Sequence, residues 1–226
     1  MPQIRAQGKT ITAIRAQGKT ITRVRFGGRD VWTAAQLTDL FDRDDGPIGP
    51  DWVLESKSGN YELAISASGV RYGIPDGLVG LTTKAATMRF VKAKSTSADG
   101  YLEVQISHKG SYDHSTRVWR RYADSGGASG VGFDFRDSRA YITKRVSSAN
   151  TLVLDLGAFV VGDIFRMRQV GNLHSAWRNG EFVGEATIAD APSGSSNRSL
   201  GLRMEGSKDF LGPRRFSPQL NYIMAS

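Results

Sequence analysis

The hydrophobic pattern beyond residue 36 is one of short alternating segments separated by Gly, Ser, Asp and Asn. In one of the clearest, Leu102, Val104 and Ile106 alternate with polar residues that include Glu103. This period of two is that of a strand with one buried face, so the polar residues are expected to point to solvent. The pattern predicts about eleven strands. They are Tyr61–Ala67, Thr87–Lys92, Tyr101–Ser107, Thr116–Tyr122, Val131–Arg136, Ala140–Val146, Ile164–Val170, Leu173–Arg178, Phe182–Ile188, Ser199–Glu205 and Leu220–Met224.

The strongest local turn signal is the pair Asn179-Gly180. A type I′ turn at this pair joins two strands as a hairpin and places Arg178 opposite Glu181. One step further from the turn, Trp177 then lies opposite Phe182.

A helix is expected only over Ala34–Phe41, where Thr33 is a suitable N-cap. No other segment keeps apolar residues at helical spacing over three turns. Strands at intervals of roughly 8–12 residues are typical of a two-sheet sandwich. The chain is therefore predicted to be all-β, a two-sheet jelly-roll sandwich preceded by a short hairpin arm.

The arm consists of a repeat. Residues 4–13 recur as residues 14–23 with nine of ten positions identical, and a degenerate third copy covers residues 24–32. If each Gln-Gly or Gly-Gly pair is a two-residue turn, the arm forms three hairpins. Their facing pairs are Ile4 with Ile11, Ile14 with Ile21, Val24 with Val31, and Arg25 with Asp30.

Side-chain parity gives the arm two apolar faces. Ile11 and Ile14 are three residues apart, so they point to opposite faces of a regular strand unless a bulge realigns them. Because isolated hairpins are marginal in water, the arm is expected to pack against its own jelly roll, other copies of itself or a docking protein. The alternative is a recently duplicated, partly ordered tail. The residues assigned to this assembly arm are Ile4, Arg5, Lys9, Ile11, Ile14, Arg15, Lys19, Ile21, Arg23, Val24, Arg25, Arg29 and Val31.

Most of the net charge of +8 lies in the arm. Residues 1–32 hold seven basic residues and one acidic residue, a net charge of +6, and the remaining residues hold 23 basic and 21 acidic groups. Attraction to an acidic surface is therefore expected to act through the arm. The nearly neutral body argues against sequence-specific binding of nucleic acid.

Composition restricts the class of protein further. Hydrophobic residues make up 39% of the chain, enough for a packed core, and the absence of Cys excludes disulfides and thiolate sites. No apolar run approaches the roughly 18 residues needed to span a membrane, and the N-terminus lacks the apolar region of a signal peptide. A soluble protein with no membrane partner is expected, made in the cytoplasm of its host cell.

Several phrases resemble a known family. The segment from Leu40 to Trp52 resembles the Phe-x-Arg-x-Asp-Gly-x-Leu-Gly-x-x-Trp opening of concanavalin-A-like (laminin-G-like) jelly-roll domains in phage tail proteins. The segment from Gly162 through Asn179-Gly180 to Leu202 is similar to the ending of those domains, and Gly27–Trp32 resembles β-segments of tail and fibre proteins of actinobacteriophages. The resemblance covers most of residues 24–226. It implies a concanavalin-A-like jelly roll in a virion surface protein, and an oligomer, with trimers common among such proteins.

The sequence offers no catalytic site. Glycosidases of this fold class carry acids as Glu-x-Asp-x-x-Glu, since the retaining mechanism needs two carboxylates about 5.5 Å apart. The nearest segment has Glu103 but Gln105 at the second position, which argues against hydrolysis and predicts a protein that is not an enzyme. No Gly-x-Ser-x-Gly elbow occurs. The histidines, which are His108, His114 and His174, lack metal-pair spacing.

No cofactor is expected, and the one weak metal candidate is calcium. Asp42, Asp44 and Asp45 cluster in a single loop, and hard cations bind clustered oxygen ligands. The alternative interpretation, which we favour, is that these residues form turns and caps.

A glycan site is the remaining candidate chemistry. Sugar sites combine aromatic faces with polar groups, and here four such residues gather around one loop and strand: Tyr112, His114, Trp119 and Tyr122. On a regular strand Tyr122 would share a face with Arg120, opposite Trp119. Trp119 is interpreted either as an exposed platform or as a core residue with snorkelling arginine neighbours, and core packing is favoured.

These observations support competing functions. The main hypothesis is a minor tail protein that docks through residues 1–32, continues through a linker at residues 33–41 and displays a jelly roll at residues 42–226 toward host-surface glycans. Its partners would be other tail or capsid proteins and further copies of itself. The alternatives are a capsid decoration or head-fibre protein and a free carbohydrate-binding module or lectin. A glycoside hydrolase is disfavoured by Gln105.

Overall fold

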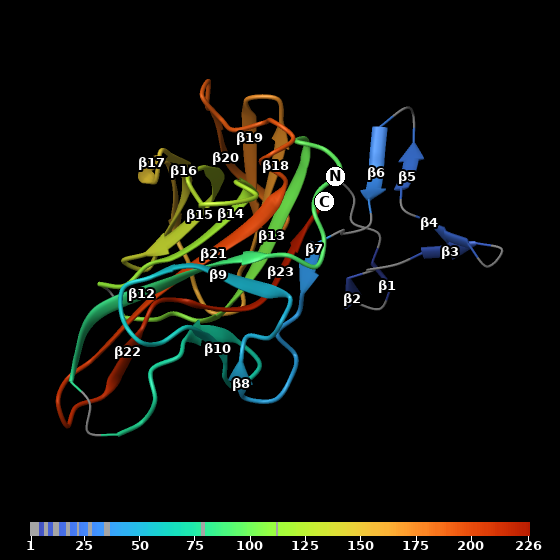
Figure 1. The fold of residues 1–226 in the computed structure, drawn as a ribbon. Coiled ribbons are helices and arrows are strands. Elements are labelled where there is room, and N and C mark those ends of the chain that lie inside the picture. The colour runs from blue at the N-terminus through green and yellow to red at the C-terminus, as the bar shows by residue number, and fades with distance from the viewer. Residues whose placement is uncertain are drawn as a thin grey trace.

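The computed structural model describes residues 37–77, 80–111 and 113–226, and in the first 36 residues only the backbone of six short strands. Every regular element in the described residues is a strand, and they hold no helix that could cross a membrane. The body is a sandwich of two antiparallel sheets, one of nine strands and one of eight (Figure 1). The predicted all-β jelly-roll sandwich is therefore confirmed.

The nine-stranded sheet has the order β20-β19-β18-β13-β23-β11-β10-β8, and β7 also pairs with β23. The bounds of these strands are Glu181–Thr187 for β20, Leu173–Arg178 for β19, Ile164–Val170 for β18, Gly100–His108 for β13, Gln219–Ala225 for β23, Val70–Tyr72 for β11, Leu63–Ile65 for β10, Gly46–Pro47 for β8 and Leu37–Asp39 for β7.

The eight-stranded sheet has the order β17-β16-β15-β14-β21-β12-β9, and β22 also pairs with β21. The bounds are Ala149–Ala158 for β17, Arg139–Val146 for β16, Gly130–Arg136 for β15, Thr116–Tyr122 for β14, Ser199–Lys208 for β21, Leu81–Phe90 for β12, Trp52–Lys57 for β9 and Arg214–Phe216 for β22. Figure 1 shows how segments far apart in the sequence, such as β14 and β21, lie side by side in this sheet.

The core lies between the two sheets and follows the predicted alternation. Leu102, Val104 and Ile106 on β13 are fully buried and belong to it. From the opposite sheet Phe133 and Phe135 contact Phe165 edge-on, with ring centroids 5.9 and 5.3 Å apart. Such aromatic pairs contribute about 0.5–1.5 kcal/mol each beyond the area they bury.

The Asn179-Gly180 hairpin forms as predicted. Both turn residues have positive φ, +52° and +89°, as a type I′ turn requires. Arg178 pairs with Glu181, and the rings of Trp177 and Phe182 lie 5.8 Å apart.

The helix expected over Ala34–Phe41 is wrong. Leu37–Asp39 is strand β7, which pairs with β23 and buries Leu37, because the backbone there completes the nine-stranded sheet. The sandwich therefore includes residues that the sequence assigned to a linker. Strands β9 and β17, which end the eight-stranded sheet, were not predicted.

The opening phrase of the resemblance has a structural basis in Asp39. Its carboxylate accepts hydrogen bonds from the guanidinium of Arg43 (2.6 and 3.0 Å), the indole N–H of Trp52 (2.7 Å) and the backbone N–H of Phe41 (2.9 Å). Burial raises the pKa of Asp39, but these hydrogen bonds and the charge of Arg43 outweigh it and hold the pKa below its ordinary value. Arg43 and Trp52 thus fasten the start of the domain to β7.

The three hairpins of the arm form, each as a separate two-stranded sheet. They pair β1 (Arg5–Ala6) with β2 (Lys9–Thr10), β3 (Ile14–Ala16) with β4 (Lys19–Ile21), and β5 (Arg23–Phe26) with β6 (Arg29–Thr33). Ile14 faces Ile21 and Arg25 faces Asp30, as expected. Val24 pairs with Trp32 rather than Val31, because a register shift falls between Val24 and Arg25. Ile4 and Ile11 lie outside the described residues.

Candidate binding face

The outer face of the eight-stranded sheet carries a line of polar side chains across five neighbouring strands. Strand register places Thr87, Arg203, Arg117, Asp134 and Tyr141 opposite one another in that order. Each alternates along its strand with core residues, so its side chain points away from the core. We call these five residues the polar row.

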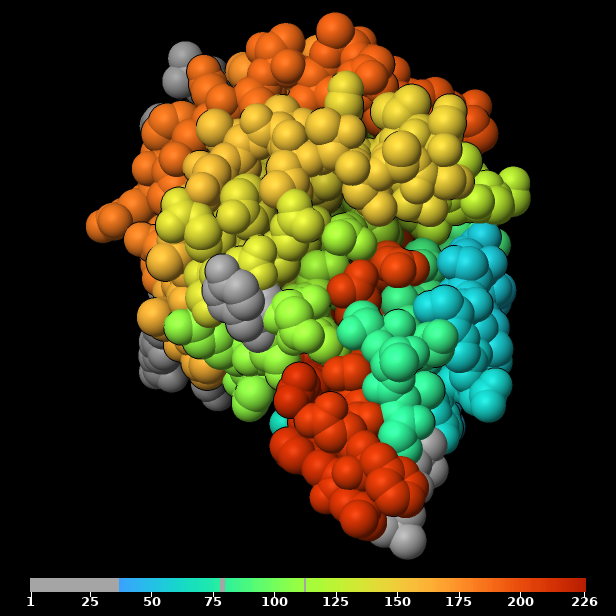
Figure 2. Space-filling model, turned by 90° about the vertical axis from the view of Figure 1, so that its left-hand side faces the viewer, coloured from blue at the N-terminus to red at the C-terminus, as the bar shows by residue number. Residues whose placement is uncertain are grey.

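The polar row lies on a hollowed surface. Figure 2 shows β21 (red) recessed between β14 (green) and β12 (teal), with β16 and β17 (yellow) rising on one side and β9 (cyan) on the other. Neighbouring strands lie about 4.8 Å apart, so the row spans roughly 19 Å. That length accommodates an extended ligand lying across the strands.

Ion pairs organise the middle of the row. The Nε of Arg117 lies 2.7 Å from Oδ2 of Asp134, and its Nη1 lies 3.5 Å from Oε1 of Glu205. The same Oε1 of Glu205 lies 3.6 Å from Nη2 of Arg203, whose Nη1 donates a long hydrogen bond of 3.4 Å to Thr87. The side chains of Arg117, Glu205 and Arg203 keep 13%, 16% and 28% of their surface exposed. The partly exposed groups are therefore the guanidinium groups of Arg117 and Arg203 and the carboxylate of Glu205, whereas Thr87 and Asp134 are buried beside them.

Two further arginines flank the row on the same sheet. Arg89 lies 2.5 Å from Glu55 through its Nε. Arg145 stacks over the ring of Trp119 at 5.5 Å, and it donates hydrogen bonds to the carbonyls of Gly127 and Ser148 and to the amide oxygen of Asn150. Within the described residues the hydrogen bonds and the ring contact of Arg145 are thus all to neutral groups.

Trp119 and Tyr122 form an aromatic wall beside the row. Their rings stack with centroids 5.5 Å apart and an interplanar angle of 19°. Trp119 pairs with Gly201 and Tyr122 with Ser199, so β14 contains one extra residue, and Arg121 takes a φ of +54° at this β-bulge. The bulge turns Tyr122 to the face of Trp119, which corrects the predicted alternation.

The wall packs closely on glycines of the neighbouring strand. A Cβ on Gly201 would lie 2.6 Å from the ring of Tyr122, so only glycine allows the ring to rest on β21. Trp119 and Tyr122 are fully buried, yet neither belongs to the core between the sheets. Trp119 is therefore not an exposed platform; it is fully packed, as the favoured interpretation expected, but outside the cluster between the sheets.

Three buried polar atoms on this face have no hydrogen-bond partner in the described part of the chain. They are the indole nitrogen of Trp119, the hydroxyl of Tyr122 and Oδ1 of Asp134. A buried donor or acceptor without a partner costs about 1–3 kcal/mol. Burial raises the pKa of Asp134 despite Arg117, and burial raises the pKa of Tyr122 to about 12. These three groups are therefore available to a hydrogen-bond partner beyond the described residues.

Three of the four residues that the sequence singled out for glycan contact are buried. His114, Trp119 and Tyr122 are fully buried, so the prediction that their side chains contact a glycan directly is wrong. His114 is held by Asp113 (2.6 Å) and Ser207 (2.9 Å). Tyr112 lies outside the described residues. The sequence identified the correct strand, β14, but not the residues exposed on it.

The other sequence candidates have structural roles. Glu103, expected on the solvent side, is almost fully buried on the outer face of the nine-stranded sheet, where it lies 2.7 Å from Arg166 and accepts a hydrogen bond from Tyr222. Asp45 accepts hydrogen bonds from Ser66 and from the backbone of Ala67. Asp42 and Asp44 are exposed in the same loop. Across residues 37–77, 80–111 and 113–226, no group of three or more His, Asp or Glu residues could hold a metal ion.

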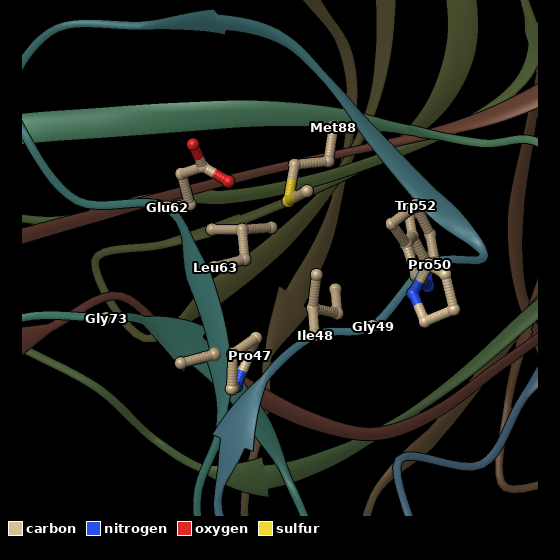
Figure 3. Close-up of a pocket in the computed structure, with 10 residues that line it drawn as sticks. Pro47, Ile48, Gly49, Pro50, Trp52, Glu62, Leu63, Gly73 and Met88 are labelled. Carbon is tan, nitrogen blue, oxygen red and sulfur yellow. The ribbon is translucent and has the colours of Figure 1, made fainter.

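A second concavity has a different character. It has a volume of about 550 Å³ and opens beside β8 and β10, where Ile48, Leu63 and Met88 gather around it (Figure 3). Its charged lining residue is Glu62. Specific recognition of a polar ligand needs several convergent donors and acceptors, and these are found on the polar row.

The residues of the polar row were missed because outward charges on a strand were taken as solvated. A signal was present in the sequence, since charged residues alternate with apolar ones on three predicted strands. These charged residues are Arg117, Asp134, Arg203 and Glu205. The sequence did not show that these strands are neighbours.

Comparisons with known proteins define the fold. No protein-family model and no curated protein matches the chain. Among solved structures, a β-1,3-1,4-glucanase (lichenase) from a mouse hindgut metagenome has a TM-score of 0.56 at 13% identity, over 85% of this chain and 99% of its own. The endo-β-1,3-glucanase from Pyrococcus furiosus has a TM-score of 0.54 at 11% identity, over 96% of this chain and 98% of its own. The carbohydrate-binding module CBM66 from Bacillus subtilis has a TM-score of 0.50 at 14% identity, over 75% of this chain and 93% of its own.

The prediction that the chain is not an enzyme is contradicted by these neighbours, since several glucanases share its fold. At such low identity the likeness carries the fold alone, and function must be argued from the site. The phage context suggested by sequence phrases is not shown by these neighbours. The chain has the concanavalin-A-like jelly-roll sandwich fold that glucanases and a carbohydrate-binding module share.

Proposed function

We propose that the chain is a carbohydrate-binding domain whose ligand lies along the polar row of the eight-stranded sheet. The observation that carries this proposal is the row itself, in which Arg203, Arg117 and Asp134 follow one another across three adjacent strands on a recessed surface. Sugar hydroxyls are both donors and acceptors, so adjacent guanidinium and carboxylate groups bind them from two sides.

The ends of the row suit the same ligand. Thr87 is buried at one end, where its hydroxyl accepts a hydrogen bond from Arg203, and Tyr141 contributes a partly exposed ring at the other end. Tyr141 combines an apolar face with a polar tip, as aromatic residues in binding sites commonly do. The glycan-acting and glycan-binding proteins among the structural neighbours support this proposal at the level of the fold.

Glycan-array screening of the full chain, followed by calorimetry on the best ligand, tests this proposal. Arg203→Met should weaken binding by about tenfold or more, the loss of roughly 1.4 kcal/mol. Arg168→Met, at an exposed position of β18 on the other sheet, is the matched control and should bind normally. The bound glycans should also be assayed for new reducing ends, which would reveal turnover. A chain that binds no glycan, or an Arg203→Met variant that binds as well as the wild type, would refute the proposal.

We propose as a second candidate function that residues 1–32 attach the domain to a larger assembly, such as the tail or capsid of a phage. The observation that favours it is the arm of three hairpins with a net charge of +6 beside a nearly neutral body. Such an arm suits an acidic docking surface or association with further copies of the chain. Deletion of residues 1–32 should abolish incorporation into particles and leave glycan binding unchanged. Wild-type incorporation of the truncated chain would contradict this role.

A further inference from the structure

We infer that the ligand of the polar row is an acidic glycan, and that its anionic group sits between Arg117 and Arg203. This inference rests on the proposed function and adds the class of ligand. The anionic group is a carboxylate, as in a uronic acid, or a phosphate, as in a phosphodiester-linked cell-wall polymer. A guanidinium binds both groups in the same bidentate manner.

The register of β14 and β21 places two arginines side by side. Arg117 and Arg203 stand directly opposite each other on these antiparallel strands. Like charges in directly opposed positions destabilise a sheet. A neutral or opposite-charge pair would be more stable, so the arginine pair points to a function that needs positive charge at this point.

The two arginines are neutralised unequally: Arg117 pairs closely with Asp134 (2.7 Å), whereas the ion-pair partner of Arg203 in the described residues is the more distant Glu205. One oxygen of Glu205 is shared between the two arginines, at 3.5 and 3.6 Å, both longer than a charge-assisted hydrogen bond. The other oxygen of Glu205 accepts the backbone N–H of Ser115. In the described part of the chain Arg203 donates one further hydrogen bond, the 3.4 Å bond to Thr87, and it keeps 28% of its side chain exposed. Its guanidinium therefore has N–H groups available to a ligand.

The hollow as a whole carries an excess of positive charge. Around the row the described arginines (Arg89, Arg117, Arg136, Arg145 and Arg203) outnumber the carboxylates (Glu55, Asp134 and Glu205), and further out Arg139 and Asp155 pair with each other. Burial lowers the pKa of Arg203, and the charges of Arg117 and Arg145 lower it further. Burial meanwhile raises the pKa of Asp134, against the opposing charge and hydrogen bond of Arg117. An anion placed among these groups would be attracted by Arg117, Arg145 and Arg203.

The test compares a galacturonic acid oligomer, the same oligomer after reduction of its carboxyl groups, and a polyglycerol phosphate. Binding to the full chain is measured by calorimetry at low and high salt. The wild type should bind the acidic oligomer or the phosphate polymer at least about tenfold more tightly than the neutral oligomer, and added salt should reduce that preference. Preference for the galacturonic acid oligomer identifies a carboxylate ligand, and preference for polyglycerol phosphate identifies a phosphate ligand.

Variants separate charge recognition from folding. Arg203→Met should abolish the preference, Arg203→Lys should retain part of it, and Arg168→Met should leave it unchanged. Equal or tighter binding of the neutral oligomer by the wild type would overturn the inference and leave the proposed function standing. Absence of binding to all three ligands would overturn the inference, and the glycan array then decides the proposed function separately. Because salt dependence is measured on the wild type, the result does not depend on any variant folding.

Discussion

His174 is enclosed between the two sheets beside two arginines, and this position predicts how the fold responds to acid. Its side chain is fully buried, and neither ring nitrogen has a hydrogen-bond partner in the described residues. Burial lowers its pKa from 6.5 to about 4, and the charges of Arg121 and Arg120 add to the shift. The folded protein therefore holds this imidazole neutral where the unfolded chain would protonate it.

The free energy at stake follows from the two pKa values. Above the unfolded value the imidazole is neutral in both states and adds no pH dependence. As pH falls below the pKa of the unfolded state, the unfolded chain binds a proton that the folded protein does not bind. The free energy of unfolding therefore decreases until the pH reaches the pKa of the folded state. The expected loss is about 2 kcal/mol by pH 5 and about 3 kcal/mol by pH 4.

Urea unfolding of the wild type and of His174→Leu, at intervals from pH 7.5 to pH 4, measures this loss. Other groups that titrate in the same window, Asp39 among them, are common to both proteins and cancel in the difference. His174→Leu should therefore lose about 3 kcal/mol less than the wild type over this range. His108→Leu, at an exposed position, is the matched control and should follow the wild type. Equal losses in the wild type and His174→Leu would refute the reasoning.

Three further predictions concern stability. Arg120→Met should lower the free energy of unfolding by about 3–5 kcal/mol in urea titrations, because the fully buried guanidinium serves acceptors from several segments; no loss would contradict it. Asp39→Asn should lower stability at pH 7 by about 1–3 kcal/mol through its bonds to Trp52 and the chain start, and the difference should shrink as pH falls through the lowered pKa of Asp39; a difference that does not depend on pH would argue against this. Gly201→Ala should cost about 1–3 kcal/mol by thermal unfolding because its methyl group meets the ring of Tyr122, and a wild-type melting temperature would show that the ring can move.

The sequence located several strands of both sheets correctly. Strands β14, β18 and β19 were predicted with their observed bounds, since a clear period of two marks a strand with one face in the core. Strands β9 and β17 were missed because they end their sheet, with one side partly open to solvent, and their polar residues blur the alternation.

The candidate site was predicted only in its position on β14. The bulge at Arg121 could not be read from the sequence, and it moved Tyr122 to the other face of the strand. Glu103 was taken as solvated because an outward position on a strand gives no sign of what packs over it, and the fold covers it with Arg166 and Tyr222.

The sequence by itself determined where most strands begin, which residues enter the core, and that the arm folds as hairpins, because these depend on neighbours within a few positions. The tertiary structure alone decided that Arg117, Asp134 and Arg203 stand side by side on a recessed surface. Their strands are brought together by long-range pairing, and whether an outward face is hollow depends on how the whole sheet twists and packs.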